Sequence, residues 1–170
     1  MDRVDAFTGL WRDQRPDLDV RPLDVWSRLK QVTTLYDRAL SEVLRRHGLS
    51  IAEFEVLATL RRTAAPHQLR PGELTRSLMV TAGAVTNRLD VLQRRGLVDR
   101  LRHTDDRRGL VVALTDKGLR VFEPALTELV GESGTLLPSL SDRQSSQLFD
   151  TLRKILVHFD DVERDAESDR

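Results

Sequence analysis

Residues 81–114 read TAGAVTNRLDVLQRRGLVDRLRHTDDRRGLVVAL, and this stretch decides the fold of the 170-residue chain. Thr81 is of a type that caps helix N-termini and Gly96 is of the type that ends helices, so we expect a helix over 82–95. Apolar residues recur along one side of this helix at steps of three and four, namely Val85, Leu89 and Leu92. The opposite side is polar and is therefore available to contact another molecule.

The second half of the same stretch predicts a β-hairpin. Residues 97–102 and 110–114 are short runs rich in β-forming side chains. The polar segment 103–109 between them ends in Gly, which is typical of a hairpin loop. Several of its residues are charged, so the tip of the hairpin carries charge.

Two more helices precede this stretch. Ser50 and Glu53 have the spacing of a capping box and open a helix that runs to about Arg62. Pro71 suits the first position of a short helix that ends near Leu78, and a tight turn joins it to the helix over 82–95. Three helices followed by a hairpin form a winged helix-turn-helix, so the expected fold class is mainly α with a small β-hairpin wing.

Long helices flank the central module. The apolar spacing predicts an amphipathic helix over 23–47, a helix over 116–136 that is interrupted or bent near Pro124, and a last helix that a second capping box opens at Ser141 and Gln144. These helices carry more apolar surface than the central module can cover, so we expect a homodimer built from both chain ends. The expected domains are an N-terminal extension with a long dimerisation helix (1–48), a DNA-binding domain (49–118), and C-terminal dimerisation helices with an acidic tail (119–170).

Charge is distributed unevenly, although the chain carries 27 basic and 27 acidic residues and has no net charge. The stretch 61–108 has a net charge of +6, and the tail 158–170 has −4. Almost all of the basic residues are arginine, whose planar fork suits phosphate and guanine. The central module therefore has the charge of a nucleic-acid reader, and a basic face that is merely solvated is the alternative.

Three segments together resemble the MarR-type transcriptional regulators over about 23–159: Gly96-Leu97-Val98-Asp99-Arg100, Asp106-Arg107-Arg108-Gly109 and Leu114-Thr115-Asp116-Lys117-Gly118. The resemblance implies a homodimer that places a recognition helix in a major groove of double-stranded DNA and a wing in a minor groove. The recognition helix corresponds to 81–89, and the Asp-x-Arg element of the family's wing corresponds to Asp106 and Arg108.

This resemblance assigns roles to the polar side of the helix over 82–95. Thr81, which caps the helix, is also expected to contact DNA. Thr86 and Asn87 reach base edges, and Arg88 and Arg94 contact phosphates or pair internally. In the wing, Arg107 or Arg108 enters a narrow minor groove, and Asp106 orients Arg108. The alternative for Asp106 is a turn residue that bonds its own backbone.

The segment 11–19 is similar to the extension of the PecS and urate-responsive branch of the family. That similarity implies an additional N-terminal helix and a ligand set of Trp11, Glu55, Arg88 and Arg100 for a small anion. Glu55 stands where the branch has Asp, which shifts the carboxylate by about a bond length and leaves the effector open between urate-like compounds and di- or tricarboxylates. Alternatively, Trp11 is a packing anchor and Glu55 only neutralises Arg88 or Arg100.

Other classes of function have weaker support. The chain has no cysteine, which excludes disulfides and thiol chemistry, and no two of its four histidines have the helical spacing of a zinc site. We therefore expect no metal, no cofactor, no catalytic residues, no membrane association and a cytoplasmic location. The expected function is a ligand-responsive repressor that binds a pseudo-palindromic operator. A ligand-independent or architectural DNA-binding regulator is the main alternative, and an enzyme that uses Glu55 as acid or base is a remote one.

Overall fold

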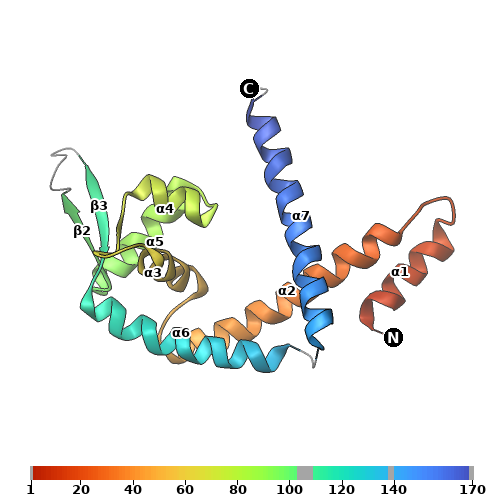
Figure 1. Cartoon of the computed structure of the whole chain (residues 1–170), viewed down its shortest axis with the longest axis horizontal. Coiled ribbons are helices and arrows are strands. Elements are labelled where there is room, and N and C mark those ends of the chain that lie inside the picture. The colour runs from red at the N-terminus through yellow and green to blue at the C-terminus, as the bar shows by residue number, and fades with distance from the viewer. Residues whose placement is uncertain (1, 103–108, 138–139, 169–170) are drawn as a thin grey trace. The chain divides into compact units, whose positions relative to one another are not determined.

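A computed structural model of the chain describes residues 2–102, 109–137 and 140–168, with side chains described as far as residue 162 (Figure 1). The order of elements is α1 (Arg3–Gln14), α2 (Arg21–Arg46), α3 (Ile51–Arg62), β1 (Gln68–Leu69), α4 (Pro71–Leu78), α5 (Ala82–Arg94), β2 (Val98–Arg102), β3 (Leu110–Leu114), α6 (Asp116–Leu136) and α7 (Asp142–Ser168). The chain divides into two compact units, residues 1–133 and 134–170. The mainly helical fold with a small sheet confirms the predicted fold class.

The sheet has three antiparallel strands in the order β1-β3-β2. β2 and β3 form the predicted hairpin, with Val98 opposite Leu114 and Arg102 opposite Leu110. β1, which lies between α3 and α4 in the sequence, adds a third strand by pairing Gln68 with Ala113. β1 was not predicted from the sequence, because two residues are too few to show the alternation of polar and apolar side chains that is typical of a strand.

The helix starts follow the predicted caps. The Ser50 hydroxyl accepts from the Glu53 amide at 3.2 Å and the Glu53 carboxylate accepts from the Ser50 amide at 2.8 Å, so the capping box of α3 is complete. Thr81 caps α5 by accepting from the Ala84 amide at 3.3 Å. These caps satisfy backbone donors that have no partner inside the helix, and they fix where α3 and α5 begin.

One apolar core joins α2, α3, α4, α5, the sheet and α6. Its fully buried members include Leu44, Val56, Leu57, Leu60, Leu74, Val85, Leu89, Leu92, Leu97, Val98, Val112, Phe122 and Ala125. The rings of Phe54 and Phe122 stack at 5.1 Å and tie α3 to α6. The predicted inward stripe of α5 is therefore confirmed, and it orients the polar side of that helix away from the core.

Pro124 does not interrupt α6, which is helical from Asp116 to Leu136. The expected interruption at this position is wrong, and the expected bend there stays a prediction. Proline removes one backbone hydrogen bond from a helix interior and disfavours helix there. Phe122 and Ala125 on either side of Pro124 are buried in the core, and their packing holds both parts of the helix in place.

α1 and α2 form a helical hairpin within the first unit (Figure 1). Arg28 of α2 pairs with Asp2 at 2.8 Å and also with Asp5, and Arg12 of α1 pairs with Asp24. Ion pairs thus help to attach α1, together with the buried side chains of Val4 and Thr8. The winged helix-turn-helix module (49–118) is joined to α2 and α6 through the apolar core.

Candidate nucleic-acid interface

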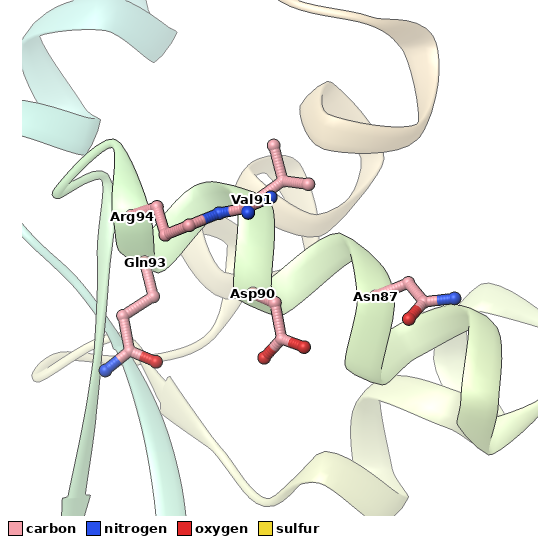
Figure 2. Close-up of a pocket in the computed structure, with 5 residues that line it drawn as sticks. All are labelled: Asn87, Asp90, Val91, Gln93 and Arg94. Carbon is pink, nitrogen blue, oxygen red and sulfur yellow. The ribbon is translucent and has the colours of Figure 1, made fainter.

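The polar side of α5 is open to solvent. Asn87, Asp90, Val91, Gln93 and Arg94 line an open hollow of about 690 Å³ along this helix. Figure 2 shows Asp90 and Gln93 projecting to the same side of α5, with Asn87 one turn nearer the helix start. A helix with such a face has the size and the donor and acceptor groups needed to read a major groove.

The predicted contact residues of α5 occupy different environments. Thr86, Asn87 and Arg94 are exposed, as base or phosphate contact requires. Arg88 instead turns toward α3, where its Nη1 atom lies 3.0 Å from Oε2 of Glu55. This ion pair fixes the position of α5 on α3, and Arg88 is only about one-fifth exposed (21%).

A second ion pair attaches the base of the wing to the same helix. Arg100 of β2 lies with its Nη2 atom 2.6 Å from Oδ1 of Asp90. The same nitrogen donates to the backbone carbonyl of Thr86 at 3.4 Å. Glu55, Arg88, Asp90 and Arg100 therefore form two ion pairs that link α3 to α5 and α5 to β2.

A third link fixes the C-terminal end of α5. Arg95 donates to the Glu53 carboxylate at 2.6 Å and to the Gly48 carbonyl at 2.7 Å. Burial raises the pKa of the Glu53 carboxyl, but hydrogen bonds from Ser50 and Arg95 outweigh this effect and hold the pKa below its ordinary value. Arg95 thus acts inside the module, and the exposed Arg94 is the cation that faces outward.

The predicted tip of the wing, Asp106, Arg107 and Arg108, lies outside the described residues. The strands that lead to it end at Arg102 and begin at Leu110, and both of these side chains are exposed. The roles assigned to the three tip residues stay predictions.

The sequence analysis missed Gln93 as a candidate contact. Gln93 lines the same hollow as Asn87 and is exposed (Figure 2). Gln93 could have been predicted from its spacing of three residues from Asp90, because residues three apart on a helix lie on the same face.

Glu55 also lines a cavity of about 460 Å³ formed by α3, α4 and α6. Two arginines of α3 line it as well: Arg61 pairs with Glu123 at 2.6 Å, and Arg62 donates to the Thr59 hydroxyl at 3.2 Å. The cavity combines arginine, hydroxyl and apolar walls, which suits a small anion with an apolar body.

Trp11 does not join Glu55, Arg88 and Arg100 within one chain. Trp11 lies on α1 next to Arg12, which pairs with Asp24 near the start of α2. α3 follows the other end of α2, and a helix of 26 residues is about 39 Å long. Trp11 and Glu55 are therefore at opposite ends of α2.

Two features are absent from the described part of the chain. No group of three or more histidine, aspartate or glutamate side chains there has an arrangement that could hold a metal ion. No described helix is long and apolar enough to cross a membrane.

The chain is similar to known regulators over most of its length. The MarR family model matches residues 49–110. The HTH-type transcriptional regulator PecS of Dickeya dadantii (strain 3937) is 36% identical over 155 residues, which cover 91% of this chain and 93% of that protein. The multiple antibiotic resistance protein MarR of Escherichia coli (strain K12) is 35% identical over 122 residues, covering 71% of this chain and 82% of that protein. The crystal structure of a mutant of the E. coli protein in complex with operator DNA matches with a TM-score of 0.70 and 32% identity, over 86% of this chain and 98% of that one.

Proposed function

The chain belongs to the MarR family of transcriptional regulators, and from that premise we propose that it is a dimeric repressor whose operator binding is controlled by a small anion. The relatives are DNA-binding regulators rather than enzymes, as expected from the sequence. We further propose that residues 49–118 read DNA, and that 1–48 and 119–170 serve mainly in dimerisation.

The observation that carries the proposal is the open polar face of α5 beside the wing. Asn87 presents an amide that can bond an adenine edge bidentately, and Arg94 presents an unobstructed guanidinium. Internal pairs hold Arg88, Arg95 and Arg100, so the face is rigid before DNA arrives. A rigid contact face lowers the ordering cost of binding.

Operator titration tests this face. The DNA flanking the protein's own gene is the probe, and the matched control is Arg21→Gln, because Arg21 is exposed and lies at the start of α2. We expect Asn87→Ala to reduce preference for the operator over random DNA, and Arg94→Gln to weaken binding to both. A uniform loss in Asn87→Ala would make Asn87 a phosphate contact and would contradict the proposed base reading.

Dimerisation is supported by apolar side chains that the chain leaves exposed. In α2 these are Leu23, Val25, Trp26, Val32 and Tyr36, and in α7 they are Leu148, Phe149, Leu156, Val157, Phe159 and Val162. Such stripes on amphipathic helices favour a partner that covers them. Analytical ultracentrifugation of the full chain is expected to show a dimer, and a monomer at micromolar concentration would contradict this part of the proposal.

The effector site is proposed at the junction of α3, α5 and β2. An anion there would compete with Glu55 for Arg88, or with Asp90 for Arg100. Either exchange would weaken a link that fixes the recognition helix, and the spacing of the two helices in the dimer would change. Operator affinity would then fall, because the two half-sites are a fixed distance apart.

Trp11 can take part in this site only from a second copy. If the α2 helices of a dimer run antiparallel, the α1 end of one copy lies near the α3 end of the other. A mixed dimer tests this arrangement. In the first mixed dimer, one chain carries Trp11→Phe and the other carries Arg88→Gln, and one complete site remains only if Trp11 acts across the dimer. In the second mixed dimer, one chain carries both changes and the other is unchanged. One complete site then remains only if Trp11 acts within its own chain.

The alternative is a regulator of the same fold that needs no ligand. It is favoured by one observation: Glu55, Arg88 and Arg100 are already ion-paired or hydrogen-bonded in the protein alone. Titration of the operator complex with urate and with citrate separates the two functions. Release of DNA supports the effector, and no release by either anion up to millimolar concentration supports the alternative.

A further inference from the structure

A second cavity lies in the groove between α1 and α2, and its volume is about 420 Å³. The α2 wall runs from Ser27 to Arg38, which is three helical turns or about 16 Å. The α1 wall consists of Arg3, Val4 and Phe7. None of these residues belongs to the junction site proposed above.

The groove is positively charged. Arg3, Lys30 and Arg38 line it, and no carboxylate does. Within the described residues these three side chains form no hydrogen bond or ion pair, whereas most other arginines of the same unit are paired, among them Arg12, Arg15, Arg21, Arg28, Arg45, Arg46, Arg61, Arg88, Arg95 and Arg100.

Three carboxylates near the start of α1 and of α2 are already engaged. Asp2 and Asp5 of α1 pair with Arg28, and Asp24 of α2 pairs with Arg12. The same pairs hold the two helices together, so α1 uses its acidic side for attachment. Arg3, one residue further along α1, is left to line the groove. The attachment of α1 therefore leaves Arg3 available to add its charge to that of Lys30 and Arg38.

Apolar surface lies beside this charge. Phe7 is 49% exposed and Leu35 is 54% exposed, and the buried Val4 forms the floor between the two helices. The ring of Phe7 is oriented by an edge-to-face contact with Trp11 at 6.5 Å. An exposed aromatic ring next to unpaired cations complements a molecule that has both an apolar body and a negative charge.

We propose that the α1–α2 groove binds a small amphipathic carboxylate, aromatic or aliphatic, at a site distinct from the junction of α3, α5 and β2. Arg3 together with Lys30 or Arg38 holds the carboxylate, and Phe7 and Leu35 cover the apolar body. The volume lies in the range of small-molecule sites. The ligand bridges the two helices and so strengthens the attachment of α1.

Isothermal titration of the full-length protein with 2-naphthoate tests the charge requirement. We expect saturable binding, and we expect the uncharged 2-naphthamide to bind at least tenfold more weakly. The double variant Lys30→Gln/Arg38→Gln should weaken 2-naphthoate binding at least tenfold, while the control Arg21→Gln should leave it unchanged. Both positions of the double variant are exposed on a helix, and Gln has a helix propensity close to that of Lys and Arg, so the fold should be kept.

Three results would overturn the proposal. Equal binding of 2-naphthoate and 2-naphthamide would show that the cations play no part, and this comparison needs no variant. Absence of 2-naphthoate binding, with a change of dimer dissociation constant in the double variant, would show that a second copy covers the groove. Loss of 2-naphthoate binding in Arg88→Gln, with retention in the double variant, would place the compound at the junction instead. The proposed operator function is measured separately, so either proposal can fail alone.

Discussion

The winged module and the helical ends of the chain differ in what their apolar side chains contact. In α3, α4 and α5, Leu57, Leu74 and Leu89 are at most 1% exposed, and they pack against one another within one chain. In α2 and α7, Val32, Phe149 and Leu156 are more than half exposed. The module thus completes its core within one chain, together with Leu44 of α2 and Phe122 of α6, whereas the outer faces of α2 and α7 carry apolar surface that a partner can cover. Stability of the module should not depend on protein concentration, and stability of the ends should.

The largest expected effect comes from opening the module core. Leu57→Ala should lower the free energy of unfolding by about 2–5 kcal/mol, because it removes a fully buried side chain and leaves a cavity. Urea unfolding followed by circular dichroism at two protein concentrations measures it. The loss should be the same at both, and a loss that grows on dilution would mean that the module also depends on the partner.

The next effect concerns the wing. Arg108→Ala should weaken operator binding by about 1–3 kcal/mol and reduce the salt slope by about one phosphate contact, because a cation is lost from the minor groove. Fluorescence anisotropy at several salt concentrations measures both quantities. The matched control is Arg15→Ala, which removes an exposed arginine paired with Asp17 far from α5. An unchanged salt slope would contradict the assignment of Arg108 to the wing contact.

A smaller effect is expected where the ends meet a partner. Leu156→Ala in α7 should raise the dimer dissociation constant roughly tenfold, which corresponds to about 1.4 kcal/mol. Sedimentation equilibrium measures it, and Ser146→Ala, an exposed polar position of the same helix, is the control. If the two variants dimerise equally well, the exposed apolar side chain of Leu156 does not lie in the interface.

The smallest effect concerns the attachment of α1 and its dependence on pH. The backbone amide of Asp5 and the guanidinium of Arg28 lower the pKa of Asp2, and the Thr8 hydroxyl and two arginines lower the pKa of Asp24. Carboxylates whose pKa is lower in the folded state stabilise it above their ordinary value of 3.8, and this contribution is lost as the pH falls through the lowered pKa.

We therefore expect the ion pairs to contribute fully to the attachment of α1 from pH 7 to pH 5, and to lose this contribution as the pH falls below 3.8. Trp11 emission in a Trp26→Phe background reports the change, because Trp11 lies on α1. Arg28→Gln should reduce the change in Trp11 emission at acid pH, because Asp2 and Asp5 lose their cationic partner. An emission change of the same size in that variant would show that other groups control it.

The sequence predicted most of the fold because its signals are local. The capping box at Ser50, the cap at Thr81 and the apolar stripe of α5 each depend on residues within a few positions, and each is confirmed. β1 was missed because its two residues are in a strand only through pairing with β3, more than forty residues away. The break expected at Pro124 is absent because packing on both sides holds the helix.

The candidate sites could be predicted only in part, because they depend on side-chain partners from distant elements. The resemblance brought Glu55 and Arg88 forward as members of one set, and they lie 3.0 Å apart. The resemblance did not indicate that Arg100 pairs with Asp90. No sequence spacing predicts which side chain of α5 lies beside a given side chain of β2. The position of Trp11 at the far end of α2 follows from the attachment of α1, which no local pattern encodes.

Gly118 at the start of α6 shows how mechanical force can pass through the molecule. A Cβ atom there would lie 2.1 Å from the carbonyl oxygen of Leu97, so the backbones of α6 and of the residue before β2 are in direct contact. Thr115 locks the same place by donating to the Gly96 carbonyl at 2.8 Å and accepting from the Gly118 amide at 2.9 Å. The start of α6 is therefore fixed against the residues that lead into β2. A tilt of α6 is expected to move the wing with it.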